Sequence, residues 1–187
     1  MSGAVPTSPP TDDGAAHHLV AGLALPDMAL AASIGGAVNL LTRQGAAIVY
    51  VYPWTGRPGV ADPPGWDDIP GAHGSTPETE GFRDHYAGFG ALGVEVLGVS
   101  TQDTAHQREL SDRLGIPFAL LSDEEFRLQK ALRLPTFDAG GRPYLKRLTL
   151  IVRDGRIGHV FYPVHPPETH AAEVLDWLAR AGAPGKA

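Results

Sequence analysis

The chain has 187 residues, of which 43% are hydrophobic and 19% are charged, with a formal net charge of −6 and no cysteine. This composition suits one compact domain with a sizeable core, and the absence of basic runs argues against a nucleic-acid partner. Without cysteine, the chain as given can hold no disulfide, no thiolate metal site and no cysteine nucleophile.

The N-terminal residues are small, polar and rich in proline, and they lack the basic and apolar regions of a signal peptide. We therefore expect residues 1–18 to form a flexible arm and residues 19–183 to form the folded domain. Pro26 and Asp27 interrupt the next apolar stretch, 19–34, which is too short to span a membrane. The expected location is the cytoplasm, with no membrane partner.

Runs of β-branched and aromatic residues predict four buried strands, at 46–52, 94–100, 118–122 and 147–152. The segment 28–40 predicts an N-terminal hairpin. The pair Asp154-Gly155 predicts that the strand ending at residue 152 turns back into another at 157–162.

Helices are predicted between the strands, at 76–90, 104–114 and 167–181, with another after Ser122. The first has Pro77 near its start, and the one after Ser122 begins with the capping pattern S-x-x-E. The alternation predicts an α/β fold, in which a mixed central sheet with parallel strands and a late antiparallel hairpin is flanked by helices. This is the element order of a thioredoxin-like fold.

The segment 53–75 is the exception, because it is rich in proline and glycine and has no periodicity. A loop of this length in a compact domain is usually functional or disordered. Trp54 and Trp66 argue for packing, and we expect the loop to act as a lid. Its pocket would be bordered by these two tryptophans, Pro53 and Thr76.

Several segments together carry a resemblance to a known family. They are LALPDMALAASIGGAVNL, VYVYP, STPETEGFRDHY, GVEVLGVSTQD, IPFALLSDEEFRLQKALRL and KRLTLIVRDGRI. The chain resembles the peroxiredoxins of the AhpC/TSA type over roughly residues 20–180, and most closely a peroxiredoxin Q-like bacterial branch with an insertion before the active helix. The resemblance implies a thioredoxin-like fold of the peroxiredoxin type, a family activity of thiol peroxidase, and no cofactor. Family members often form dimers, so a homodimer is one expected assembly.

Carried over residue by residue, the family's peroxidatic cysteine falls on Ser75, its resolving cysteine on Glu80 and its active-site arginine on Arg147. The signature P-x-x-x-T-x-x-C is broken, because Ala72 stands at the threonine position; Thr55 is the candidate to replace it in space. The family mechanism needs a thiolate. A serine hydroxyl is a poor nucleophile toward peroxide, so that mechanism is not available to this chain.

Ser75 has more than one interpretation. It is an engineered replacement of a cysteine, or the protein naturally lacks that cysteine; Glu80 shows only that the resolving cysteine is absent. From the residues alone, Ser75 and Glu78 also fit the S-x-x-E capping box, in which Ser75 would be the helix N-cap.

Three functions therefore stay open. The first is a peroxiredoxin-like protein without its catalytic cysteine. The second is a non-redox enzyme, for example in small-molecule biosynthesis, that uses a pocket of His73, Ser75 and Arg147 with His73 as general base. The third is a non-catalytic binding protein. A helix N-terminus facing a guanidinium favours a small anionic or oxygen-rich ligand, and the histidine spacing predicts no metal site.

Overall fold

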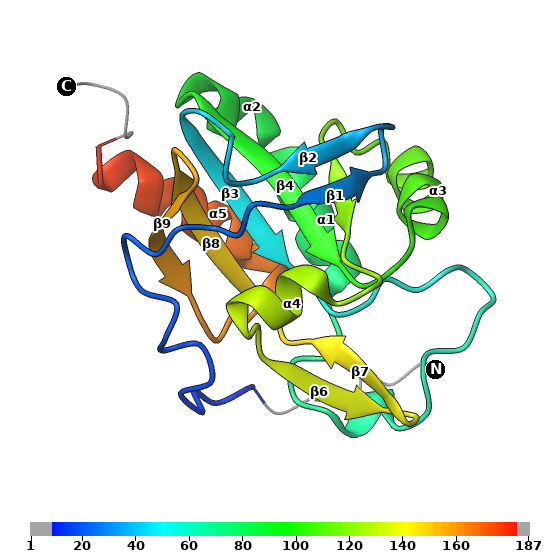
Figure 1. Ribbon diagram of the computed structural model, residues 1–187. Coiled ribbons are helices and arrows are strands. Elements are labelled where there is room, and N and C mark those ends of the chain that lie inside the picture. Colours follow the sequence, from blue (N-terminus) through cyan, green and yellow to red (C-terminus); the bar gives the residue numbers. More distant parts are fainter. Residues whose placement is uncertain (1–8, 183–187) are drawn as a thin grey trace.

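The computed structural model describes residues 9–182 and contains a seven-stranded mixed sheet with helices on both faces (Figure 1). The sheet has the order β2-β1-β5-β4-β3-β8-β9. Its strands are β1 (Ala29–Ala32), β2 (Ala37–Asn39), β3 (Ala46–Val51), β4 (Val94–Ser100), β5 (Leu120–Ser122), β8 (Leu148–Arg153) and β9 (Arg156–Phe161). The helices are α1 (Ser75–Asp84), α2 (Tyr86–Ala91), α3 (Thr104–Leu114), α4 (Arg127–Leu132) and α5 (Pro167–Arg180), with a 3-10 turn at Trp66–Asp68.

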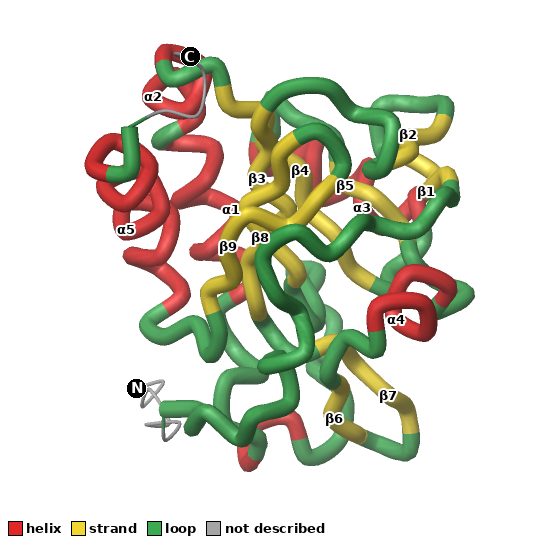
Figure 2. Tube along the Cα trace, turned by 60° about the vertical axis from the view of Figure 1, so that its left-hand side comes forward, coloured by secondary structure: helices red, strands yellow, loops and turns green. Residues whose placement is uncertain are grey.

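The centre of the sheet is β3, which pairs in parallel with β4 and antiparallel with β8. Its residues alternate between two cores, because successive side chains of a strand point to opposite faces. Ile48 and Tyr50 join a cluster that includes residues of α1, α2 and α5, whereas Val49 and Val51 join one that includes α4. Figure 2 shows these two groups of helices on opposite sides of the sheet. The predicted mixed sheet flanked by helices is confirmed.

The structure corrects two predicted helices. The first is interrupted at His85, where α1 ends and α2 begins. The S-x-x-E pattern after Ser122 does not act as a capping box. Instead, the side chain of Asp123 accepts the amide protons of Leu128 and Gln129, at 2.9 and 2.8 Å, so that α4 starts at Arg127.

A second hairpin, β6 (Thr136–Ala139) and β7 (Arg142–Leu145), forms a separate two-stranded sheet that the sequence analysis missed. Its two strands pair antiparallel around Gly140-Gly141, both at positive φ. The hairpin packs against the 53–75 loop through Ala139 and Tyr144, which cluster with Trp66.

Part of the N-terminal segment packs against the domain, whereas the sequence predicts a flexible arm over residues 1–18. Residues 1–8 lie outside the described residues, but residues 9–18 pack against the domain. Ala16 is buried in the core, and a ring nitrogen of His18 lies 2.8 Å from the carbonyl oxygen of Leu132. Contacts with distant parts of the chain therefore hold residues 9–18 against the domain, although this segment is polar.

The β8–β9 turn yields a test of packing. Gly155 has φ +73°, and a Cβ there would overlap the carbonyl oxygen of Leu41; Gly141 has φ +76° with nothing within 4 Å. We expect Gly155→Ala to lower the free energy of unfolding by about 3 kcal/mol or more, since strain and a backbone clash add. Gly141→Ala should cost only about 1 kcal/mol, from strain alone. Urea denaturation measures both, and equal losses would contradict the packing argument.

Candidate active site

Ser75 is the first residue of α1, and the residue that caps the helix is Gly74. Gly74 has φ 101°, and a Cβ there would overlap the ring of Pro167 at the start of α5, so glycine is required by both conformation and space. The alternative interpretation, in which Ser75 is the N-cap, is therefore wrong. Its side chain makes no capping bond, is 2% exposed, and is free to meet a partner from another element.

That partner is Arg147, which immediately precedes β8 and is 5% exposed. Its Nη2 donates to the Ser75 hydroxyl at 3.1 Å and to the carbonyl oxygen of His73 at 3.0 Å. It also lies 3.4 Å from the carbonyl oxygen of Gly71. The serine and arginine that the resemblance singled out, 72 positions apart in the chain, are thus in direct contact.

A third group, Glu78, completes the cluster and was missed as a site residue. It is fully buried and accepts a hydrogen bond from Nη1 of Arg147 in an ion pair. Burial raises the pKa of Glu78 from 4.5 to about 7, and Arg147 opposes that rise. The sequence did hold a signal, because Glu78 lies one helical turn after Ser75 and so faces the same side.

Glu78 also changes the expected electrostatics. The sequence predicted a helix N-terminus facing a guanidinium, which favours an anionic ligand, yet the charge of Arg147 is balanced whenever Glu78 is ionised. The arrangement can hold a hydroxyl or another oxygen atom at the start of α1, where the free N–H groups of the helix point.

A cavity of about 340 Å³, which we call the Ser75 cavity, opens beside the start of α1. It is lined by Trp54, Gly56, Arg57, Pro58, Asp62, Trp66, Ala72, His73, Gly74, Ser75, Thr76, Pro77 and Arg113. The 53–75 loop supplies most of this wall. Trp66 is 3% exposed and packs edge-on against Tyr144 at a centroid distance of 4.9 Å, while Trp54 is half-buried. The expected burial of the two tryptophans is confirmed; Thr76 lines the cavity, and Pro53 is buried without lining it.

Three other candidate site residues have partners other than Ser75. Thr55 donates its hydroxyl to the side-chain oxygen of Gln102 at 2.8 Å, and no hydrogen bond links it to Ser75 among residues 9–182. The ring of His73 contacts Asp67 at 2.8 Å instead of the Ser75 hydroxyl, so the structure does not assemble a serine–histidine pair. Glu80 is half-exposed, and its Oε1 lies 3.8 Å from Nη1 of Arg83.

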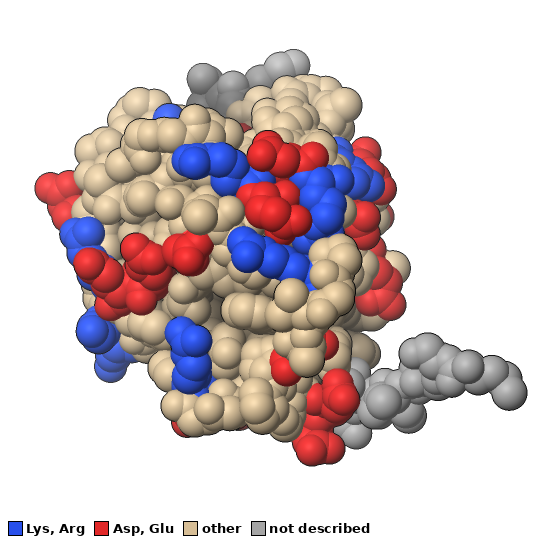
Figure 3. All heavy atoms as spheres, turned by 90° about the vertical axis from the view of Figure 1, so that its right-hand side faces the viewer, with Lys and Arg blue, Asp and Glu red and all other residues tan. Residues whose placement is uncertain are grey.

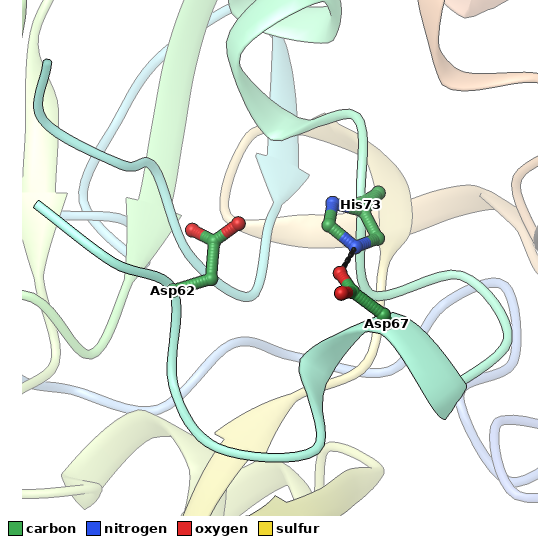
Figure 4. Close-up of side chains that lie close together, drawn as sticks. All are labelled: Asp62, Asp67 and His73. Carbon is green, nitrogen blue, oxygen red and sulfur yellow. Dashed lines mark hydrogen bonds and ion pairs between the residues drawn. The ribbon is translucent and has the colours of Figure 1, made fainter. Parts of the chain in front are cut away.

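The contact between His73 and Asp67 belongs to a small cluster on the loop (Figure 4). One ligand atom each of Asp62, Asp67 and His73 lies within 4.8 Å of the others. These are the residues in the described part of the chain that could hold a divalent cation. Both carboxylates are exposed, and the histidine–carboxylate hydrogen bond already gives the arrangement a structural role within the loop.

The surface charges are mixed. Figure 3 shows Lys and Arg side chains interspersed with Asp and Glu on one face of the molecule. Among the ion pairs, Arg57 and Arg113 both pair with Glu109, at 3.4 and 2.7 Å. Within residues 9–182, no helix is long and apolar enough to cross a membrane.

Comparison with known proteins decides the family. The sequence pattern described as Redoxin matches residues 20–175. Peroxiredoxin Q of rice (Oryza sativa subsp. japonica), named as chloroplastic, is 30% identical over 158 residues, which are 84% of this chain and 65% of the rice protein. The chain is a member of the peroxiredoxin family.

Solved structures agree with this assignment. A cysteine-to-serine mutant of peroxiredoxin Q from Xanthomonas campestris superposes with a TM-score of 0.69 at 25% identity, covering 87% of this chain and 98% of that one. Peroxidoxin BcpB from Mycobacterium tuberculosis has the same TM-score at 22% identity, over 87% and 98% of the two chains, and supports the fold. The peroxiredoxin type of thioredoxin-like fold is confirmed. This peroxiredoxin lacks the catalytic cysteine, since the chain contains none.

The raised pKa of Glu78 predicts a pH dependence of stability. A carboxyl whose pKa rises from 4.5 to about 7 on folding stabilises the fold fully below pH 4.5, and this contribution is lost as the pH rises through 7. The loss should reach about 3 kcal/mol. Urea denaturation between pH 5 and 8 should show it in the unaltered protein, whereas Glu78→Gln should remove this part of the slope.

Glu80→Gln is the matched control, two residues further along the same helix and half-exposed. Glu80→Gln should show the same fall in the free energy of unfolding between pH 5 and 8 as the unaltered protein. A Glu78→Gln protein that loses stability with pH as the unaltered protein does would show that Glu78 ionises normally in the fold.

Proposed function

We propose that this chain is a peroxiredoxin Q-like protein that carries out no thiol peroxidase reaction and instead holds a small oxygen-rich or anionic ligand at Ser75 and Arg147. The observation that carries the proposal is the 3.1 Å contact between the Arg147 guanidinium and the Ser75 hydroxyl at the first turn of α1. A fixed donor and unpaired helix N–H groups both favour an oxygen atom with partial or full negative charge.

The surroundings of Ser75 support a ligand-holding role. The Ser75 cavity of about 340 Å³ falls within the range of small-molecule pockets, about 300–1,000 Å³. Its polar groups include Thr76 and Arg113 besides Ser75. The anchored tryptophans of the 53–75 loop give it a fixed wall, in keeping with a lid over the start of α1.

Assembly, source and location are part of the same proposal. We infer a homodimer, because peroxiredoxins often pair, and a bacterial protein of the cytoplasm that binds neither nucleic acid nor membrane. The plant relatives are named as chloroplastic, and the rice protein is longer than the matched segment. The mixed surface charge in Figure 3 accords with the absence of a nucleic-acid partner.

Restoring the sulfur tests the proposal. Ser75→Cys should place a thiol where the α1 N-terminus and Arg147 stabilise its anion, each by about 1 kcal/mol. A pKa of about 8.5 for a free thiol would then fall to roughly 6–7. With glutamate at position 80, the variant should reduce hydrogen peroxide only with an external thiol such as dithiothreitol. The unaltered protein should show no such activity.

Ser111→Cys on α3 supplies the control, because Ser111 is half-buried and is not among the residues that line the Ser75 cavity. Its thiol should titrate near the free value and consume peroxide no faster than free cysteine. The pKa of each thiol is measured by pH-dependent alkylation. If Ser75→Cys behaves like Ser111→Cys, the pocket has been remodelled and the proposed ligand site at Ser75 loses its support.

A further inference from the structure

The 53–75 loop carries a group of three side chains that bind metal ions in other proteins (Figure 4). They are Asp62, Asp67 and His73, and we call them the Asp62 cluster. One ligand atom of each lies within 4.8 Å of the others. The spacing of histidines along the chain predicts no metal site, and it misses this cluster because two of the three members are aspartates that only the folded loop brings together.

The distances within the cluster suit a small divalent ion. Zinc binds imidazole nitrogen and carboxylate oxygen at about 2.0–2.2 Å, so neighbouring ligands lie about 3.0–3.4 Å apart and opposite ligands about 4.2 Å apart. Oδ1 of Asp67 and Nε2 of His73 are 2.8 Å apart, which is close to the spacing of neighbouring ligands. The 4.8 Å span of the whole cluster exceeds the opposite spacing by only about 0.6 Å.

Two members of the cluster are held in place, and the third can adjust. Asp67 follows Trp66 in the 3-10 turn, and the ring of His73 packs edge-on against Trp66, which is 3% exposed, at a centroid distance of 6.4 Å. Asp62 is exposed and lies opposite these two side chains in Figure 4. Within residues 9–182 its carboxylate has no hydrogen bond or ion pair, so a small movement toward an ion breaks no contact.

The charges around the cluster favour a cation. Two arginines, Arg57 and Arg113, also line the Ser75 cavity, but both pair with Glu109. With a neutral His73, the two aspartates of the cluster and Glu109 set three carboxylates against two guanidinium groups, which leaves an excess of negative charge. A divalent ion at the cluster would compensate that excess.

We propose that the Asp62 cluster binds a divalent transition-metal ion such as Zn²⁺, through one carboxylate oxygen each of Asp62 and Asp67 and through Nε2 of His73. An imidazole among carboxylates suits such an ion better than Ca²⁺ or Mg²⁺, which prefer oxygen ligands alone. On binding, the ion takes the place of the proton between His73 and Asp67, and the neutral ring carries its proton on Nδ1.

The position of the cluster gives the ion access to a ligand. Three protein ligands leave a coordination position for water, as in catalytic zinc sites. Asp62 and His73 also line the Ser75 cavity, so an ion held by them borders that cavity. The metal site itself does not depend on the ligand proposed at Ser75.

Metal titrations of the full chain test the proposal. The untagged protein is stripped of metal with EDTA and titrated with Zn²⁺ by calorimetry and with Mn²⁺ by electron paramagnetic resonance. We expect one ion per chain, with Zn²⁺ bound more tightly than Mn²⁺ and Mg²⁺ bound at least about tenfold more weakly than Zn²⁺. Asp62→Asn and His73→Gln should each weaken Zn²⁺ binding by about tenfold or more.

Two control variants separate this site from general binding to acidic or histidine-containing surface. Asp68→Asn removes the exposed carboxylate next to Asp67 and changes the charge as Asp62→Asn does. His17→Gln removes the ring from another exposed histidine–aspartate contact, with Asp12 at 3.0 Å. Both variants should bind Zn²⁺ as tightly as the unaltered protein.

The proposal is overturned by the absence of saturable Zn²⁺ binding, by Asp62→Asn or His73→Gln proteins that bind as tightly as the unaltered one, or by an equal loss in either control. Equal affinity for Mg²⁺ would also contradict it. If His73→Gln fails to fold, Asp62→Asn still decides, because Asp62 has no partner to lose in the described part of the chain. The proposed ligand at Ser75 is tested separately, by the thiol pKa of Ser75→Cys.

Discussion

The buried guanidinium of Arg147 connects the parts of the molecule that make the site. It stands at the start of β8, forms an ion pair with Glu78 of α1, and donates to the backbone of the loop at His73. Burying two charges is costly, and the cost is offset only when both are paired and hydrogen-bonded. The strand, helix and loop are therefore held in one arrangement, and the Ser75 hydroxyl is presented as a consequence of it.

The cluster keeps the geometry of a redox site without the atom that does the chemistry. A thiolate at Ser75 would benefit from the helix N-terminus and from Arg147. A hydroxyl at neutral pH gains no comparable reactivity from these groups, and we propose that the cluster holds an oxygen atom of a ligand instead. Burial of Glu78 brings its pKa to about 7, where proton uptake changes the net charge beside Arg147.

The 53–75 loop and the N-terminal segment give the region its two cavities. The loop is anchored by Trp66 in a cluster with Ala139 and Tyr144 of the β6–β7 hairpin. The N-terminal segment is anchored by Asp13 at Lys146 and Tyr162. The loop lines the Ser75 cavity and, together with the N-terminal segment, a second space of about 220 Å³ beside Lys146 and Arg147.

Local sequence determined most of the regular elements and the family. The apolar runs became β3 and β4 because a central strand is buried on both faces, and α3 begins at the Asp103 cap and ends at Gly115 as its residues indicate. The peroxiredoxin motifs likewise located Ser75 and Arg147. Such features depend on the spacing of apolar side chains and on the backbone conformations that a few neighbouring residues prefer.

Only the tertiary structure decided which polar groups meet. Helical spacing places Glu78 on the face of Ser75, but its pairing and raised pKa come from burial against Arg147. Thr55 bonds to Gln102, which follows β4, and His73 to Asp67 of the same loop, because the fold brings these groups within hydrogen-bond distance. The packing of residues 9–18 rests on partners more than a hundred positions away, and no local pattern encodes contacts of that range.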